Sequence, residues 1–239
     1  MSPFRLSGFA DEIDADFRTQ LNGLNELGIG YIEVRGVNGG NISTLTAAQI
    51  TEVKHQLEAH GVQVSSIGSP VGKIQITDEF TPHLDMFKRI LDTAHTLRSP
   101  FIRVFSFYMP EGEDPSLYRD EVIDRMGAIV ETAKGSGITL VHENEKHIYG
   151  DTAERCLDLM TTLKADHWGS AFDPANFIQC EEEVFPKAFS LLKPYIRYVH
   201  IKDAQADGQV VPAGYGVGRV EDVLRTLKAD GYEGFLSLE

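Results

Sequence analysis

The chain has 239 residues, of which 42% are hydrophobic and 24% charged, a composition typical of a single globular domain spanning residues 1–239. Its 22 basic and 36 acidic residues give a formal charge of −14, which repels polyanions, so we do not expect nucleic acid as a partner. The two cysteines, Cys156 and Cys180, form no CxxC pair and indicate neither a disulfide framework nor a cysteine zinc site. Charged residues interrupt the first 30 positions and no apolar stretch reaches 18 residues, so we expect no signal peptide, no membrane span and a cytoplasmic location.

Short apolar runs alternate with longer amphipathic runs along the whole chain, a pattern typical of repeated βα units and a parallel sheet. No Ser/Gly linker divides it. The predicted strands are Phe4–Phe9, Tyr31–Arg35, Val62–Ile67, Phe101–Phe105, Ile138–Glu143, Trp168–Phe172, Ile196–Ile201 and Gly234–Glu239. The predicted helices lie near 14–27, 44–60, 79–97, 117–135, 151–164, 184–193 and 220–230.

Eight such units predict a single-domain α/β fold, the (β/α)8 TIM barrel. A doubly wound open sheet is the alternative, but no GxGxxG follows the first strand and polar residues occur at many strand ends rather than at one switch point. The eighth predicted strand ends at Glu239 without a following helix. Because a barrel lacking that helix would expose an apolar groove of roughly several hundred Å², we expect the natural chain to continue by about one helix.

Four potential metal ligands each close one of the apolar runs: Glu143, Asp173, His200 and Glu239. They are separated by 30, 27 and 39 residues, close to the roughly 31 residues of one βα unit in a barrel, whose strands all end on the same rim. Three carboxylates about 4 Å apart would repel one another by about 4 kcal/mol per pair at an effective dielectric constant near 20. The spacing therefore predicts one bound divalent cation.

Each of these residues also has a structural interpretation when taken alone. Asp173 precedes Pro174, a common turn or helix-start signal, and a single histidine such as His200 is more often a core residue than a ligand. Glu143 and Glu239 could be a solvated loop residue and a frayed end. The metal hypothesis rests on the conjunction of all four at successive strand ends. Three carboxylates and one imidazole favour Mn²⁺, Mg²⁺ or Co²⁺ over a structural zinc, although Zn²⁺ or iron is also compatible. Three negative charges around a dication leave the site net negative, which favours neutral polyols such as sugars.

Longer motifs surround these positions: Gly8-Phe9-Ala10-Asp11-Glu12, Ile32-Glu33-Val34-Arg35, Ser66-Ile67-Gly68-Ser69-Pro70-Val71-Gly72-Lys73, His142-Glu143-Asn144-Glu145, Phe172-Asp173-Pro174-Ala175-Asn176, His200-Ile201-Lys202-Asp203 and Leu236-Ser237-Leu238-Glu239. With them the chain resembles the sugar isomerases and epimerases of the xylose isomerase-like TIM-barrel superfamily. The resemblance implies that Glu143, Asp173, His200 and Glu239 bind one divalent metal. It also implies that Glu143 and Glu239 transfer protons in catalysis.

The implied chemistry is removal of a proton from the carbon next to a metal-polarised carbonyl, through an enediolate. Return of the proton to the opposite face is epimerisation, and return to the neighbouring carbon is aldose–ketose isomerisation. The sequence leaves both open. The superfamily often has histidine three residues after the aspartate, where this chain has Asn176. If the metal were removed, repulsion between the carboxylates would raise the pKa of at least one of them.

Further positions on the same rim are candidates for contact with the substrate: Glu33, Lys73, Arg103, Asn176, His147 and Lys202. Glu33 could instead form an ion pair with Arg35 or Arg103, and Lys73 could be a surface lysine. Arg103 lies inside an apolar strand, where a charge needs a partner. Lys202 and Asp203 could orient His200 or nearby loops, and Phe107 and Tyr108 could form pocket walls beside His147.

Other functions within the resemblance stay open at this stage. A polyol dehydratase would use the same ligands. An apurinic-site endonuclease would need a histidine-rich trinuclear zinc site, whereas the strands ending near Ile67 and Phe105 carry no histidine. A catalytically silent barrel is the third possibility. The expected partner is a small sugar or polyol, and a homo-oligomer is possible.

Overall fold

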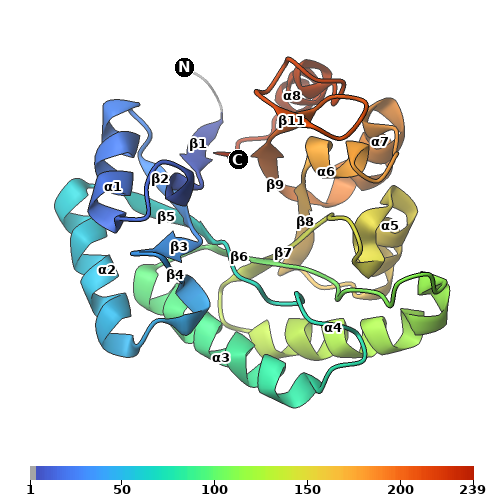
Figure 1. The fold of residues 1–239 in the computed structure, drawn as a ribbon, viewed down its shortest axis with the longest axis horizontal. Helices are drawn as coiled ribbons and strands as arrows, with labels where there is room; N and C mark the ends of the chain where they lie inside the picture. The colour runs from blue at the N-terminus through green and yellow to red at the C-terminus, as the bar shows by residue number, and fades with distance from the viewer. Residues whose placement is uncertain (1–3) are drawn as a thin grey trace.

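The computed structural model describes residues 4–239; Met1 to Pro3 of the predicted domain lie outside the described residues. Eight parallel strands form a nearly closed barrel with helices on the outside, as predicted (Figure 1). Neighbouring strands in the sheet follow the order β1 (Arg5–Gly8), β12 (Phe235–Leu238), β9 (Ile196–Ile201), β8 (Trp168–Phe172), β7 (Thr139–Glu143), β6 (Phe101–Val104), β5 (Gln63–Ile67) and β2 (Tyr31–Val34).

The barrel has one seam without ladder pairing, between β1 and β2 at the two ends of that order. Side chains meet inside the barrel near this seam, where the Oγ atoms of Ser7 and Ser65 lie 2.6 Å apart. Ser65 also contacts the hydroxyl of Tyr198 at 2.8 Å, so a buried layer of hydroxyl groups fills this level of the interior. These internal bonds satisfy polar groups that would otherwise destabilise the barrel.

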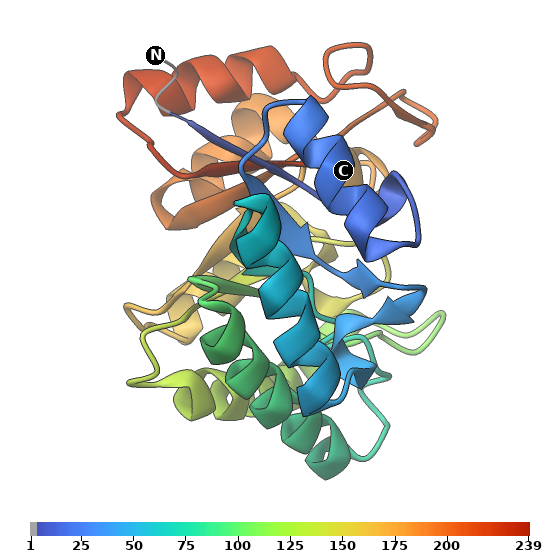
Figure 2. The ribbon, with the colours of Figure 1, turned by 90° about the vertical axis from the view of Figure 1, so that its left-hand side faces the viewer.

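Helices cover the outside of the strands, and the first four pack side by side in chain order (Figure 2). The long helices are α1 (Phe17–Glu26), α2 (Ala47–His60), α3 (Phe80–Leu97), α4 (Arg119–Ala133), α5 (Ala153–Thr162) and α8 (Val220–Ala229). The α2 helix begins three residues later than predicted because Thr46 and Gln49 form a capping box there. Gly61 follows it in the left-handed conformation, which glycine adopts without strain.

The structure differs from the prediction most clearly between β8 and β9. A short helix, α6 (Pro174–Ile178), begins directly after β8, because the Asp173 side chain caps its first turn and Pro174 fits there. The single helix predicted near 184–193 is instead η5 (Val184–Ala188), α7 (Phe189–Leu192) and η6 (Lys193–Tyr195).

Short 3₁₀ turns occur elsewhere: η1 (Ala10–Glu12), η2 (Ile42–Thr44), η3 (Pro115–Tyr118) and η4 (Tyr149–Asp151). Two small hairpins pair β3 (Gly36–Val37) with β4 (Gly40–Asn41) and β10 (Asp203–Ala204) with β11 (Val210–Val211).

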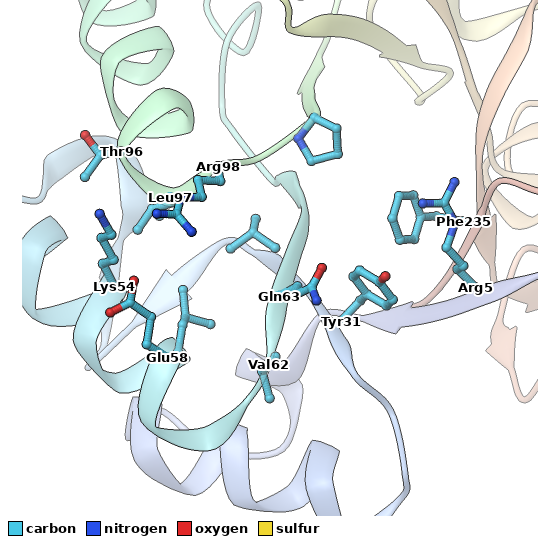
Figure 3. Close-up of a pocket in the computed structure, with 13 residues that line it drawn as sticks. Arg5, Tyr31, Lys54, Glu58, Val62, Gln63, Thr96, Leu97, Arg98 and Phe235 are labelled. Carbon is cyan, nitrogen blue, oxygen red and sulfur yellow. The ribbon is translucent and has the colours of Figure 1, made fainter.

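The two ends of the barrel differ in chemistry. At the N-terminal ends of the strands, Tyr31 and Phe101 pack edge-on against Phe235 and close the interior. A cavity of about 450 Å³ lies on that side. Figure 3 shows Arg5, Tyr31 and Phe235 among the residues that line it. The polar side chains predicted to form the site lie at the opposite ends of the strands, the usual position of TIM-barrel active sites.

The outer face near β1 and β12 is partly uncovered in the described chain. Leu6 is 48% exposed and Leu238 is 41% exposed. The additional helix expected from the sequence stays a prediction. Among residues 4–239, none of the helices combines the length and the apolar character that crossing a bilayer requires.

Candidate metal centre

Four strand ends bring the predicted ligands together at the C-terminal rim. Glu143 ends β7, Asp173 follows β8, His200 lies in β9 and Glu239 follows β12. One potential ligand atom from each lies within 4.8 Å of the others. Three of the side chains are buried, and that of Glu239 is 11% exposed, so the cluster sits at the base of the rim with Glu239 on its open side.

His200 presents Nδ1 to the carboxylates and Nε2 to the barrel interior. Nδ1 lies 3.0 Å from Oε1 of Glu143, 3.5 Å from Oε2 of Glu239 and 3.8 Å from Oδ2 of Asp173. Nε2 lies 3.2 Å from Oε2 of Glu33. Glu33 is therefore buried beneath the imidazole, where it fixes the ring and leaves Nδ1 to face the cluster.

The carboxylates retain unused binding capacity. Oε2 of Glu143, Oδ2 of Asp173 and Oε2 of Glu239 are buried and accept no hydrogen bond. Leaving such oxygens unsatisfied is costly, and a divalent cation would satisfy all three. The donor set of three carboxylates and one imidazole nitrogen thus fits a divalent metal ion.

Burial and neighbouring charges raise the pKa of Asp173 but leave that of Glu143 lowered. Burial raises the pKa of Asp173 to about 7, the charges of Glu143 and Glu239 add to this effect, and Lys202 opposes it. The sequence predicted a raised carboxylate pKa in the absence of metal, and the pKa of Asp173 is raised, although burial contributes more to it than repulsion between the carboxylates. Burial also raises the pKa of Glu143, but His200 and Arg103 outweigh it and hold that pKa well below its ordinary value.

Three basic side chains surround the carboxylates. Arg103, which is 4% exposed, places Nη1 3.2 Å from Oε2 of Glu143. Arg35 places Nη1 3.1 Å from Oε1 of Glu239, and Nζ of Lys202 lies 3.7 Å from Oε2 of the same glutamate. The expectation of a net negative site counted only the three carboxylate ligands and the ion, whereas these three cations and the nearby carboxylates of Glu33 and Asp11 also lie beside the cluster.

Asn176 connects the metal ligands to Lys202. Its Nδ2 donates to Oε1 of Glu143 at 3.1 Å and to the Asn144 carbonyl at 2.9 Å, and its Oδ1 accepts from Nζ of Lys202 at 3.2 Å. Its backbone N–H donates to Asp173. The amide therefore donates two hydrogen bonds and accepts one, whereas a neutral imidazole has a single donor and a single acceptor.

The remaining predicted contacts lie farther out on the rim. Lys73 pairs with Glu145 at 2.8 Å and lies over the Phe105 ring at 4.2 Å. His147 is exposed and lines a cleft of about 620 Å³ together with Tyr108. Phe107 is not a pocket wall, because it is fully buried against Phe80 and His83 behind the strands.

Sequence reasoning missed three residues that contact the ligands. Arg35 was considered only as a partner of Glu33, but it reaches Glu239. Asn144 exchanges two hydrogen bonds with the backbone of Asp173, at 2.9 and 3.0 Å. Phe9 packs edge-on against His200 with ring centres 5.3 Å apart. Their positions in the sequence could have indicated this role, because all three residues lie next to strand ends that carry or adjoin a predicted ligand.

A family model described as the xylose isomerase-like TIM barrel matches residues 21–239. The chain belongs to this family. Its sequence matches no curated protein. The family covers all four ligand positions, and the fold and family expected from the sequence are confirmed.

Solved structures of xylose isomerase-like barrels share the fold at low identity. A barrel protein of this family from Mycobacterium smegmatis in complex with magnesium is 21% identical, with a TM-score of 0.76 over 93% of this chain and 81% of that one. The probable 3-DHS dehydratase of petrobactin synthesis from Bacillus anthracis is 16% identical, with a TM-score of 0.82 over 99% and 92%. The 3-keto-D-glucoside 4-epimerase from E. coli is 17% identical, with a TM-score of 0.75 over 99% and 91%.

In this xylose isomerase-like barrel, Asp203 organises the loop that follows β9. Its carboxylate accepts backbone hydrogen bonds from Gly214, Gly216 and Gly218 at 2.9, 3.0 and 2.9 Å. A Cβ atom at Gly216 would lie 2.3 Å from Oδ1 of Asp203, so only glycine fits there. Asp203 thereby fixes the chain next to Lys202, as one of the sequence interpretations proposed.

Proposed function

We propose that the chain is a divalent-metal-dependent isomerase or epimerase of a sugar, sugar phosphate or cyclic polyol. The observation that supports it most directly is the convergence of Glu143, Asp173, His200 and Glu239 within 4.8 Å at the C-terminal rim of the barrel. The fold neighbours include a sugar epimerase and a dehydratase, and one neighbour is described with magnesium. We propose Mn²⁺, Mg²⁺, Co²⁺ or Zn²⁺ as the ion.

Bound at these four side chains, the ion supplies the positive charge that polarises a substrate carbonyl. The protein's own residues provide the proton transfer. The Glu239 side chain is 11% exposed on the open side of the cluster, and its buried Oε2 accepts no hydrogen bond, so this carboxylate is the proposed base for a substrate C–H. Glu143 is enclosed by Asn176 and Arg103 across the cluster and is the second proton-transfer group.

Among the substrate-binding candidates that contact the cluster, Lys202 is the most exposed. Nζ lies 3.7 Å from both Asp173 and Glu239, and the side chain is 16% exposed. Asn176 holds the ammonium in place through Oδ1. A substrate oxygen next to the carboxylates would meet this positive charge, which stabilises negative charge developing on oxygen. Arg103 and Glu33 would support the ligands, while Lys73 and His147 would contact more distant parts of a longer substrate.

A polyol dehydratase is the second candidate, because proton removal beside a carbonyl is also the first step of eliminating a neighbouring hydroxyl group. The dehydratase among the fold neighbours supports it. An apurinic-site endonuclease is less well supported, because a trinuclear site needs further histidines and the one possible metal cluster in residues 4–239 contains a single histidine. We place the enzyme in the cytoplasm, consistent with the free Cys156 and Cys180.

Metal analysis tests the proposal. Purified protein is loaded with Mn²⁺ or Co²⁺, dialysed and analysed for bound metal, alongside Asp173→Asn and the exposed-site control Asp92→Asn. We expect about one ion per chain in the wild type and the control, and loss of the ion in Asp173→Asn. Three zinc ions would support the endonuclease, and absence of metal from the wild type would refute the proposal.

Turnover in deuterated water then separates the reactions. Deuterium at the carbon next to the carbonyl, with inversion, indicates epimerisation, and deuterium on the neighbouring carbon indicates isomerisation. Loss of water with formation of a conjugated double bond indicates dehydration. Turnover without deuterium incorporation would exclude proton exchange with solvent and favour hydride transfer.

A further inference from the structure

The four potential ligands Glu143, Asp173, His200 and Glu239 are here called the metal quartet. A polar cluster that includes Glu239 joins three segments that are distant in sequence. Arg35, directly after β2, holds Asp11 of η1 in a bidentate pair, with Nε to Oδ2 at 2.8 Å and Nη2 to Oδ1 at 3.0 Å. Its third donor, Nη1, reaches Oε1 of Glu239 at 3.1 Å. Glu12 contacts the same guanidinium from the exposed side at 3.2 Å. We call Arg35, Asp11 and Glu239 the seam clamp.

The clamp lies where the barrel has no ladder hydrogen bonds. Asp11 follows β1 and Arg35 follows β2, the two strands that do not pair. The main chain holds Glu239 weakly, since its N–H donates to the Ile201 carbonyl at 3.4 Å, a long distance for such a bond. Among the polar contacts described for the Glu239 side chain, the one with Arg35 is the shortest, and it crosses the seam.

The surrounding packing keeps the clamp in one arrangement. The Arg35 guanidinium lies over the Phe9 ring at 4.3 Å, a favourable cation–π contact. A Cβ atom at Gly36 would lie 2.7 Å from Oδ2 of Asp11, and one at Gly68 would lie 2.8 Å from the Phe9 ring. A residue larger than glycine at position 36 would therefore displace Asp11, and one at position 68 would displace Phe9.

The two oxygens of Glu239 have different environments as a result. Arg35 holds Oε1, whereas Oε2 lies 3.5 Å from Nδ1 of His200 and accepts no hydrogen bond. We propose that Arg35, itself fixed by Asp11, is a positioning residue that turns Oε2 of Glu239 toward the metal quartet. This role rests on the proposed function, and it couples assembly of the metal centre to closure of the β1/β2 seam.

A Co²⁺ titration followed by visible absorption tests the role without a substrate. The variants are Arg35→Met, Arg35→Lys and Asp11→Asn. The matched control is Arg119→Met, which breaks another bidentate pair, with Asp158 between α4 and α5. We expect Arg35→Met to bind Co²⁺ about 10- to 100-fold more weakly, with an altered spectrum, because supporting partners of metal ligands have effects of this size. Arg35→Lys keeps the positive charge but lacks the planar guanidinium that binds a carboxylate through two donors, so its affinity for Co²⁺ should fall less than that of Arg35→Met. The affinity of Asp11→Asn should lie between those of wild type and Arg35→Met.

Hydrogen exchange provides a metal-independent measurement on the same proteins. In the metal-free state, the segment 235–239 should exchange faster in Arg35→Met than in wild type or Arg119→Met. Wild-type Co²⁺ affinity and spectrum in Arg35→Met, or unchanged exchange in 235–239, would overturn the positioning role. If the wild type itself bound no Co²⁺, the proposed function would fail, and the exchange comparison would still decide whether Arg35 holds Glu239. Should Arg35→Met not fold, Arg35→Lys carries the same two tests.

Discussion

Oε2 of Glu33 lies 3.2 Å from Nε2 of His200, on the edge of the imidazole opposite the metal quartet. Both side chains are completely buried. A buried carboxylate behind a histidine ligand fixes the ring orientation and makes the facing nitrogen more basic. Glu33 therefore acts on the candidate metal centre through His200, and its place beneath the ring keeps it off the open rim.

Replacing Glu33 should weaken metal binding. We expect Glu33→Ala to lower the affinity for Mn²⁺ or Co²⁺ about 10- to 100-fold, and Glu33→Gln to lower it less, because the amide oxygen can still accept from Nε2–H. Titration with either ion measures the effect, with the exposed Glu52→Gln as control. Equal affinities in all four proteins would contradict the role assigned to Glu33.

Asn176 offers an isosteric test of the amide bridge. In Asn176→Asp, a carboxylate would replace the donor that lies 3.1 Å from Glu143, so a hydrogen bond becomes a repulsive contact between buried charges. We expect the free energy of unfolding of the metal-free protein to fall by about 1–3 kcal/mol. Urea unfolding checks this, and Asn22→Asp on the exposed face of α1 should change little. A variant as stable as the wild type would show that the bridge contributes nothing.

His83 should make the protein sensitive to acid. Its Nε2 accepts from the backbone N–H of Gly72 at 2.7 Å, which requires the neutral ring, and burial together with Arg125 holds its pKa below the ordinary 6.5. Below pH 6.5 the unfolded chain binds more protons at this residue than the folded one, so stability falls as the pH falls.

The comparison of His83→Gln with wild type isolates that contribution. We expect the free energy of unfolding to decrease less steeply between pH 6.5 and 5 in the variant. Urea unfolding at several pH values measures the slopes, and His95→Gln on the exposed face of α3 serves as control. Parallel slopes for His83→Gln and wild type would rule out a contribution from His83.

Asp203 should govern the order of the loop after β9. Asp203→Asn replaces a charged acceptor of three glycine N–H groups by a neutral one that has an oxygen on only one side. Because hydrogen bonds to charged groups contribute about 1.5–3 kcal/mol each, we expect a loss of stability of that order and faster proteolysis within 205–219. Asp207→Asn, in the same loop but exposed, is the control, and equal cleavage rates in the two variants would refute this prediction.

The barrel and its family were accessible from the sequence because both depend on local patterns. Each βα unit repeats its own apolar periodicity, and parallel connections place all strand ends on one rim. Glu143, Asp173, His200 and Glu239 could therefore be grouped without coordinates. The helix near 184–193 was predicted less well, because Phe185 takes an extended backbone before Pro186 and a turn containing Pro194 follows Leu192, so the α-helix is confined to Phe189–Leu192.

The amino-acid sequence by itself determined the number of βα units, their order and the four strand ends that carry potential ligands. Only the tertiary structure decided how the ligands are supported: which nitrogen of His200 faces the carboxylates, how Asn176 joins Glu143 to Lys202, and that Arg35 reaches Glu239 across 204 positions of the chain. The physical reason is the range of the forces involved. Periodicity and capping act over a few residues, whereas side-chain hydrogen bonds require the distances and angles that exist only once the barrel has closed.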